Sequence, residues 1–289
     1  MPELPEVESV RRGLTAARVR APVTAVWRSA QALRIGAEWR RDKENLAILK
    51  GATPGRVHRR GKYLLWHMHG ADQRELVLLI HLGMSGRCGI ARAEQDRVVH
   101  THLVVDFADG RQLRFVDPRR FGGLRAGLAE TIYTAEPLAS LGPEPLDRNF
   151  DGELLAQTLG RSDRALRDAL LDQRAVAGIG NIYALEACFE ARLHPLLPAR
   201  RLAPSAWQRL AEAVQAALRR GIENGGTTLK DFRNVTGDVG RNQDDLRVYG
   251  RAGEPCPACA TPLRGFVHQG RSGVFCPRCQ ARPRSRRVA

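Results

Sequence analysis

The first residues of the chain, Met1, Pro2 and Glu3, have the makings of an amine catalyst. Pro2 is small, so processing is expected to remove Met1 and leave the secondary amine of Pro2 at the terminus. An α-amino group has a pKa near ~8 and a Lys side chain near ~10.4, so far more of the terminal amine is a free nucleophile at neutral pH. A secondary amine that condenses with an aldehyde must form a cationic iminium, which is an electron sink that promotes elimination. Glu3 stands beside it as an acid or base.

The same residues are also typical of a plain helix start. Pro is favoured in the first helical turn, and an acid such as Glu6 suits the helix dipole there. Val7, Val10 and Leu14 follow at helical spacing. The segment alone therefore fits either interpretation, and the rest of the chain must decide.

Four of the six cysteines form two C-x-x-C pairs, Cys256 with Cys259 and Cys276 with Cys279. Two such pairs at this interval are typical of a tetrahedral zinc site, and the segment 263–275 between them is typical of a hairpin that turns at 269–273. Two disulfides are the alternative, which a cytosolic chain disfavours. Four Cys ligands leave no open position, so we expect one structural zinc ion. Cys88 and Cys188 are isolated and are expected to be buried thiols.

Composition points to a polyanionic partner. The chain has 289 residues, enough for two domains, and a net charge of +15 at pH 7. Its apolar runs are too short to span a bilayer, and its acidic start is not a secretory signal, so we expect a cytoplasmic protein without a membrane partner. The basic residues concentrate in two zones, 40–62 and 282–287.

The hydrophobic pattern changes along the chain. Residues 23–125 are typical of antiparallel strands, including a hairpin that turns at Asp109 and Gly110. A connection rich in Pro and Gly follows at 129–150, and helical patterns then dominate, most clearly at Ser205–Arg220. The stretch 233–245 is typical of a loop. These patterns predict an α+β protein of several domains rather than a doubly wound sheet.

Taken together, these features resemble the formamidopyrimidine-DNA glycosylase family. The resemblance covers essentially the whole chain and is most specific at six segments, Met1–Glu8, Arg59–Leu64, His81–Gly86, Asp117–Gly122, Val176–Tyr183 and Val248–Arg251. It implies an N-terminal catalytic antiparallel β-sandwich flanked by helices (2–128), a linker (129–150), a helix–two-turn–helix domain (151–245), a zinc finger built on a β-hairpin (246–281) and a basic tail (282–289).

The resemblance also implies the reaction. The Pro2 amine attacks C1′ of a damaged nucleoside while Glu3 transfers protons at the sugar, and the iminium then drives β- and δ-elimination. Lys62 is expected to clamp a phosphate and donate a proton, and Arg271 to grip the phosphate at the lesion. A solvated cation is the alternative for Lys62. The implied activity is a bifunctional glycosylase and abasic-site lyase for 8-oxoguanine and formamidopyrimidines opposite cytosine, acting as a monomer on damaged double-stranded DNA.

A base can leave the duplex only if something fills the gap. The resemblance assigns this task to three side chains in turns bounded by glycines, and it places four further side chains on the DNA backbone. The first group is Met84, Arg119 and Phe121, and the second is His81, His100, Arg164 and Asn181. If each stood alone, Met84 and Phe121 would be taken for core residues and the histidines for structural ones.

Two alternatives remain. The first is an endonuclease VIII-like glycosylase for oxidised pyrimidines, which Leu4 disfavours; the Gly240–Asp245 loop, which lacks aromatic residues after its glycine, leaves lesion preference open. The second is a zinc-finger protein that binds DNA without catalysis, which the joint presence of Pro2, Glu3, Lys62 and Arg271 disfavours.

Overall fold

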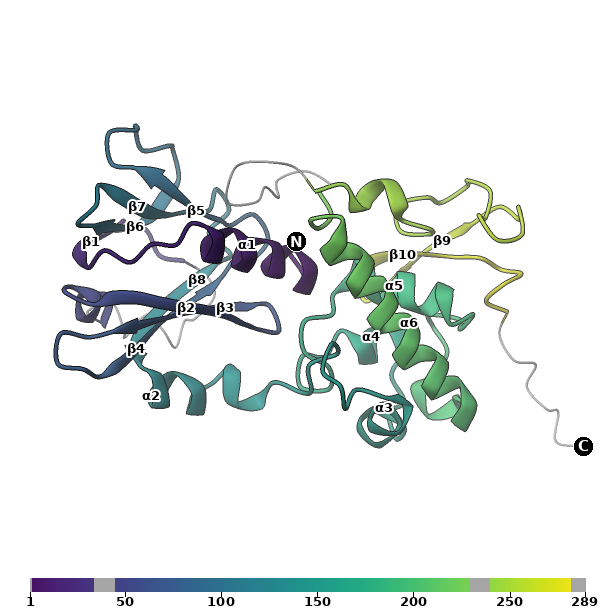
Figure 1. Ribbon diagram of the computed structural model, residues 1–289. Helices are drawn as coiled ribbons and strands as arrows, with labels where there is room; N and C mark the ends of the chain where they lie inside the picture. The colour runs from purple at the N-terminus through teal and green to yellow at the C-terminus, as the bar shows by residue number, and fades with distance from the viewer. Residues whose placement is uncertain (1, 34–44, 229–239, 282–289) are drawn as a thin grey trace, which may run out of the picture. The chain divides into compact units, whose positions relative to one another are not determined.

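The computed structural model describes residues 2–33, 45–228 and 240–281. The chain forms two compact units (Figure 1). Unit 1 comprises Met1–Ser140 with Gly221–Gln243, and unit 2 comprises Leu141–Arg220 with Asp244–Ala289. None of the helices within the described residues combines the length and the apolar character that crossing a membrane requires.

Unit 1 is a sandwich of two antiparallel sheets with a helix at its start, α1 (Leu4–Ala16). The first sheet has the order β1-β6-β7-β5 and the second the order β2-β3-β4-β8. In chain order the strands are β1 (Val23–Arg28), β2 (Thr53–Arg60), β3 (Tyr63–His69), β4 (Glu75–His81), β5 (Arg87–Arg92), β6 (Thr101–Phe107), β7 (Arg111–Val116) and β8 (Gly123–Leu128). The predicted antiparallel sandwich is confirmed.

One hydrophobic core joins α1 to both sheets. It contains Val7 and Val10 of α1, Trp66 of β3 and Leu103 of β6. The helical spacing of the N-terminal apolar residues thus places them on the buried face of α1, as predicted. The predicted hairpin is β6–β7, and Gly110 in its turn has a φ of +78°, which glycine adopts without strain.

The stretch predicted as a connection, 129–150, begins with ordered structure. Helix α2 (Ala129–Thr134) and a 3₁₀ turn, η3 (Leu138–Ser140), follow β8 directly. Ile132 of α2 is buried, and the Tyr133 hydroxyl lies 2.9 Å from Nε2 of His67 on β3. Ile132 and the hydrogen bond of Tyr133 therefore help to attach α2 to the rest of unit 1.

Unit 2 contains helices and a small hairpin. Its helices are α3 (Gly152–Leu159), α4 (Leu166–Leu170), α5 (Asn181–Glu190) and most of α6 (Pro204–Glu223), and its strands are β9 (Arg264–His268) and β10 (Arg271–Phe275). The remaining elements of the chain are 3₁₀ turns: η2 (Asn45–Leu49) in unit 1, η4 (Ala199–Arg201) in unit 2, and η5 (Asn242–Asp245) where the chain passes from unit 1 to unit 2. The predicted helix Ser205–Arg220 is confirmed within α6. Most of the predicted loop 233–245 and the whole basic tail lie outside the described residues, although 242–245 forms η5.

Candidate functional site

The N-terminal turn is held by the carboxylate of Glu6. One oxygen, Oε2, accepts a hydrogen bond of 2.7 Å from the backbone N–H of Glu3, the N-cap residue of α1, in a capping-box arrangement. The other, Oε1, accepts one of 2.7 Å from the backbone N–H of Thr227. Glu3 and Glu6 are each 1% exposed, and Pro2 is buried as well. The helix start and the candidate catalytic terminus are therefore the same rigid structure.

Lys62 lies in the tight turn between β2 and β3, beside Gly61, whose φ is +53°. The Lys62 side chain is 8% exposed, so it is not the freely solvated cation that was the alternative interpretation. Arg59, at the end of β2, connects this turn to α1: it donates to the carbonyl of Gly61 at 3.2 Å and pairs with Glu8 at 3.3 Å. Burial alone would raise the pKa of Glu8, but its bond with Arg11 and the charge of Arg59 lower it below the usual value.

His81 ends β4 directly across from Tyr63 of β3. Burial, with a contribution from the positive charge of Lys62, lowers the pKa of His81 to about 3. Its Nδ1 accepts a hydrogen bond of 3.0 Å from the backbone N–H of Gly83. The neutral ring must then carry its proton on Nε2, which makes that nitrogen a donor suited to an anion.

We expect His81 to stay neutral down to mildly acidic pH. An unfolded His has a pKa near ~6.5, so between pH 6.5 and about 3 the unfolded chain binds a proton that the folded chain refuses. The His81 contribution to stability is thus fully present above pH ~6.5 and is lost as the pH falls through this window. The ring resonances of His81 should not titrate between pH 8 and 5, and H81N should unfold with a weaker pH dependence; a midpoint near 6.5 would contradict the assignment.

Two turns that carry Met84, Arg119 and Phe121 lie against each other. A Cβ on Gly83 would sit 2.3 Å from the backbone carbon of Phe121, so only glycine permits this approach. Met84 is 39% exposed, and the Arg119 guanidinium lies 5.4 Å from the centre of the Phe121 ring. The structure therefore brings these three predicted residues together, with Met84 at an exposed tip.

The buried carboxylate of Asp117 joins the two turns. Its Oδ1 accepts from the Ser85 hydroxyl at 2.6 Å, and its Oδ2 accepts from the backbone N–H of Gly122 at 2.7 Å. The backbone N–H of Asp117 donates to the carbonyl of His100 at 3.0 Å. His100 is exposed and has a φ of +67°, so the predicted DNA contact at His100 lies beside the same turn.

Removing this carboxylate should be costly. Asp117→Ala leaves two buried donors without an acceptor, at about 1–3 kcal/mol each, so the free energy of unfolding should fall by roughly 2–6 kcal/mol. Ser85→Ala removes one of these bonds and leaves only Oδ1 of Asp117 without this donor, so it should cost less, about 1–3 kcal/mol. Urea denaturation of both variants measures the difference, and an unchanged midpoint for D117A would show that the carboxylate does not hold the turns.

In unit 2, Asn181 links a helix start to the hairpin. It is the first residue of α5; its Oδ1 accepts from Arg167 at 3.1 Å, and its Nδ2 donates to the carbonyl of Ser272 at 2.9 Å. Arg167, which is fully buried, also donates to the carbonyl of His268 at 3.0 Å and pairs with Asp168 at 2.7 Å. Asn181 and the hairpin turn therefore form one hydrogen-bonded unit.

Arg271 is the first residue of β10 and pairs with His268 across a two-residue turn. Both turn residues, Gln269 and Gly270, have positive φ values, 48° and 69°, which is the geometry of a tight hairpin. Arg271 itself is exposed. Arg164 stands in a loop before α4, where its guanidinium pairs with Asp172 at 2.8 Å.

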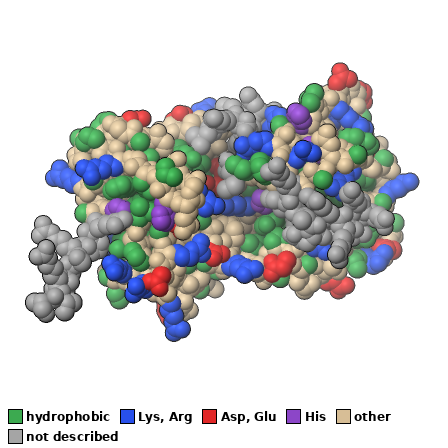
Figure 2. Space-filling view, turned by 180° about the vertical axis from the view of Figure 1, so that it is seen from behind, with side chains coloured by type: hydrophobic (Ala, Val, Ile, Leu, Met, Phe, Trp, Pro, Cys, Tyr) green, Lys and Arg blue, Asp and Glu red, His purple; other side chains and the backbone are tan. Residues whose placement is uncertain are grey.

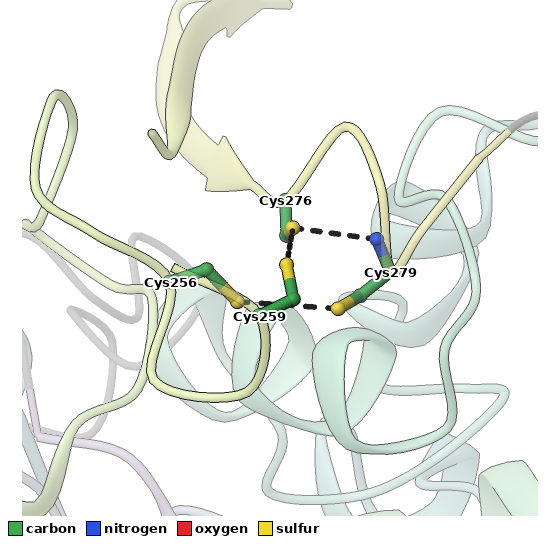
Figure 3. Close-up of side chains that lie close together, drawn as sticks. All are labelled: Cys256, Cys259, Cys276 and Cys279. Carbon is green, nitrogen blue, oxygen red and sulfur yellow. Dashed lines mark hydrogen bonds between the residues drawn. The ribbon is translucent and has the colours of Figure 1, made fainter. Parts of the chain in front are cut away.

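The four cysteines predicted as zinc ligands form one cluster (Figure 3). All four Sγ atoms lie within 4.8 Å of one another, and two pairs are 3.5 Å and 4.0 Å apart. A tetrahedral site with zinc–sulfur bonds of about 2.3 Å places its sulfur atoms about 3.8 Å apart, so this set fits zinc. Backbone N–H groups of Ala258 and Cys279 donate to the sulfur atoms of Cys256 and Cys276.

The remaining two thiols are buried, as predicted. Burial raises the pKa of Cys88 and that of Cys188 to about 12 each, so both stay protonated at neutral pH. Neither belongs to the metal-ligating cluster found in the described part of the chain.

Known proteins of one family match this chain over most of its length. Three family profiles match: the formamidopyrimidine-DNA glycosylase N-terminal domain over 1–124, the H2TH domain of the same enzyme over 141–233, and a zinc finger found in FPG and IleRS over 253–282. The formamidopyrimidine-DNA glycosylase of Teredinibacter turnerae is 43% identical over 280 residues, which are 97% of this chain and 100% of that protein. The chain belongs to the formamidopyrimidine-DNA glycosylase family.

Solved structures of this glycosylase family share the fold. The MutM (Fpg) protein of Thermus thermophilus matches with a TM-score of 0.84 and 39% identity, over 98% of this chain and 100% of that one. Lactococcus lactis Fpg, in a complex with DNA that contains an abasic site, matches with a TM-score of 0.85 and 32% identity, over 97% and 100%. The predicted family, fold class and zinc finger are thereby confirmed.

Three residues that hydrogen-bond to predicted site residues, or to the turns that carry them, were not themselves predicted: Glu6, Asp117 and Arg167. Glu6 was noted only as an acid of the first turn, although its position three residues after Glu3 matches a capping box. Asp117 opens a segment already singled out for Arg119 and Phe121. No sequence pattern predicts that Arg167 is buried, because its partners come from distant segments.

Proposed function

We propose that this chain is a base-excision repair enzyme that removes oxidised purines from duplex DNA and then cuts the strand at the abasic site. The observation that carries the proposal is the N-terminal Pro2-Glu3 pair, held rigidly by Glu6, in a chain whose full length matches formamidopyrimidine-DNA glycosylases. Neither DNA binding nor the zinc finger alone requires an N-terminal amine.

The chemistry follows from the residues. The nitrogen of Pro2 attacks C1′, the glycosidic bond breaks, and the base departs with its electron pair and takes up the proton that the amine loses. Glu3 protonates the sugar oxygen, so the ring opens and leaves a cationic iminium at C1′. Loss of a proton from C2′ then expels the 3′ phosphate, and a second elimination expels the 5′ phosphate. Buried Lys62 donates a proton near the amine, and both Lys62 and Arg271 bind phosphate.

Duplex DNA is the proposed partner. Lys and Arg outnumber Asp and Glu by 46 to 31, and many of them lie on the face shown in Figure 2. We propose that Met84 and Phe121 fill the space that the everted base leaves in the duplex. Arg119 would hydrogen-bond to the unpaired partner base, which is expected to be cytosine. His81, His100, Arg164 and Asn181 are proposed to contact the backbone; the pairing of Arg164 with Asp172 means that this contact requires Arg164 to change partners.

All of these groups come from one chain, which supports action as a monomer. We also propose the cytoplasm as its location, and the domain limits 2–128, 151–245 and 246–281 with a linker at 129–150 and a tail at 282–289. Zinc would be held by the four cysteines, and with no open ligand position it would stabilise the hairpin rather than act on the substrate.

Borohydride trapping on a set of duplexes tests the function. The set contains 8-oxoguanine opposite each base, a formamidopyrimidine, an oxidised pyrimidine and a plain abasic site. We expect a reducible protein–DNA crosslink with the purine lesions opposite cytosine and with the abasic site. Absence of a crosslink with every duplex would overturn the enzymatic proposal.

The same set distinguishes the two alternatives. Preferential crosslinking to the oxidised pyrimidine would favour the endonuclease VIII-like activity. Binding without any crosslink, in a protein whose intact mass shows that Met1 persists, would favour a non-catalytic DNA-binding protein.

A further inference from the structure

Unit 1 contains a cavity that the proposed glycosylase chemistry does not use. It has a volume of about 320 Å³ and lies between the second half of α1, the segment that leaves it, and the start of β2. Four arginines contribute to its lining, Arg11, Arg18, Arg20 and Arg56. None of the residues assigned above to catalysis or DNA contact lines it.

The charge of this cavity is unbalanced. Its lining contains no Asp or Glu. Arg11 is neutralised by Glu8 at 2.8 Å and Arg56 is near Glu75 at 3.5 Å, but both acids lie outside the lining. For Arg18 and Arg20 the described residues provide no ion pair, and Arg20 donates only to the carbonyl of Pro54, at 3.4 Å. Two exposed guanidinium groups therefore remain available to an anion.

Besides the arginines, the lining contains the polar residues Thr15 and His58, several apolar residues, and one donor without an acceptor. Leu14, Val57 and Trp66 are all buried and line the cavity. The indole N–H of Trp66 is buried, and within the described residues it has no hydrogen-bond acceptor. A buried donor without an acceptor destabilises the protein, so a ligand that supplies an acceptor would recover that free energy.

We propose that this cavity binds a small phosphorylated molecule with a flat ring, of the class of a nucleoside monophosphate. The phosphate would be bound by Arg18 and Arg20, whose guanidinium groups match its oxygens in pairs. The ring would cover Val57 and Trp66, with a ring acceptor for the indole N–H. The cavity volume falls at the small end of the range of about 300–1,000 Å³ for ligand sites. The backbone of a DNA duplex could supply phosphates to the arginines, but it has no exposed ring that could cover Val57 and Trp66.

The indole N–H of Trp66 is a direct reporter for a binding test on the full chain. The chain has four Trp residues, so its ¹H–¹⁵N spectrum should show four indole cross-peaks, and Trp66→Phe identifies the relevant one. Adenosine and guanosine 5′-monophosphate should shift this peak saturably. The double variant R18Q/R20Q should weaken binding at least about tenfold, since it removes charge-assisted bonds.

Matched controls separate a site from general charge attraction. Arg12→Gln removes an exposed arginine of α1 that does not line the cavity and should leave the nucleotide affinity unchanged. Adenosine, which lacks the phosphate, and inorganic phosphate, which lacks the ring, should each bind at least tenfold more weakly than the nucleotide.

Three outcomes would overturn the proposal. They are a Trp66 peak that does not move with either nucleotide, equal weakening by R12Q and R18Q/R20Q, and an undamaged duplex that shifts the peak as strongly as the nucleotide does. Cleavage of an 8-oxoguanine duplex by R18Q/R20Q should match the wild type. Because that assay is separate, failure of this site and failure of the glycosylase proposal can be told apart.

Discussion

A protein that carries any residue in front of Pro2 should form no covalent adduct with a damaged duplex. Extension turns the secondary amine into an amide, whose nitrogen no longer has an available electron pair. The trapped fraction should fall on the order of 10³-fold or more, as expected when a covalent nucleophile is lost. Retained Met1 and an added N-terminal tag should have the same effect, measured by borohydride trapping on an abasic duplex.

The matched control carries the same tag after Ala289 and should react like the untagged chain. Binding of the uncleaved abasic duplex, followed by mobility shift without borohydride, should survive the N-terminal extension at least in part. A crosslink at the wild-type rate from the extended protein would show that the nucleophile is another amine, and Lys62 would be the first to examine.

A substitution of Glu3 should separate base release from formation of the covalent adduct. Glu3→Gln keeps an amide oxygen at the N-cap of α1 but cannot protonate the sugar. It should release little 8-oxoguanine yet still form an adduct with a preformed abasic site, where the base has already left. The comparison of the two substrates by trapping assigns the amine to bond formation and the carboxyl to base release.

Local patterns account for the parts of this protein that were predicted from the sequence. The zinc ligands lie in two short segments whose spacing encodes the geometry, and the β6–β7 hairpin depends on two turn residues. The start of α1 likewise shows in the apolar spacing of the first 14 residues. Each of these features is specified by one short segment, or by two short segments at a fixed spacing, so it can be predicted without knowledge of the fold.

The groups that hold the site in place depend on long-range contacts. Glu6 meets Thr227 across 221 positions, and Arg167 meets His268 across 101. A buried charge is tolerated only when it is paired and hydrogen-bonded, and those partners are chosen by the fold rather than by neighbours in sequence. Sequence motifs therefore indicated which residues could react, but not which carboxylates and guanidinium groups fix them.

Removal of zinc should weaken DNA binding strongly while unit 1 stays folded. The cysteines belong to a small core, and two other members of that core, Leu185 and Phe189, belong to α5. Apparent zinc-binding free energies of structural sites are about 10–16 kcal/mol, so four unliganded thiols cannot be expected to hold this hairpin. The hairpin carries Arg271, and its Ser272 carbonyl accepts a hydrogen bond from Asn181, so both residues would then lose their positions.

The proposed contacts of Arg271 and Asn181 with the DNA backbone would then be lost. At about 1.5–3 kcal/mol each for charged hydrogen bonds, this loss should weaken binding to an abasic duplex by two orders of magnitude or more. Cys276→Ser should act like a chelator, and added zinc should restore the chelated wild type but not the variant.

Cys188→Ala, which removes a buried thiol of unit 2 outside the cluster, is the matched control. Mobility shift measures binding, and the near-ultraviolet circular dichroism of unit 1 residues such as Trp66 reports its fold. A metal-free protein, verified by elemental analysis, that binds the duplex at full strength would show that the hairpin holds Arg271 without zinc.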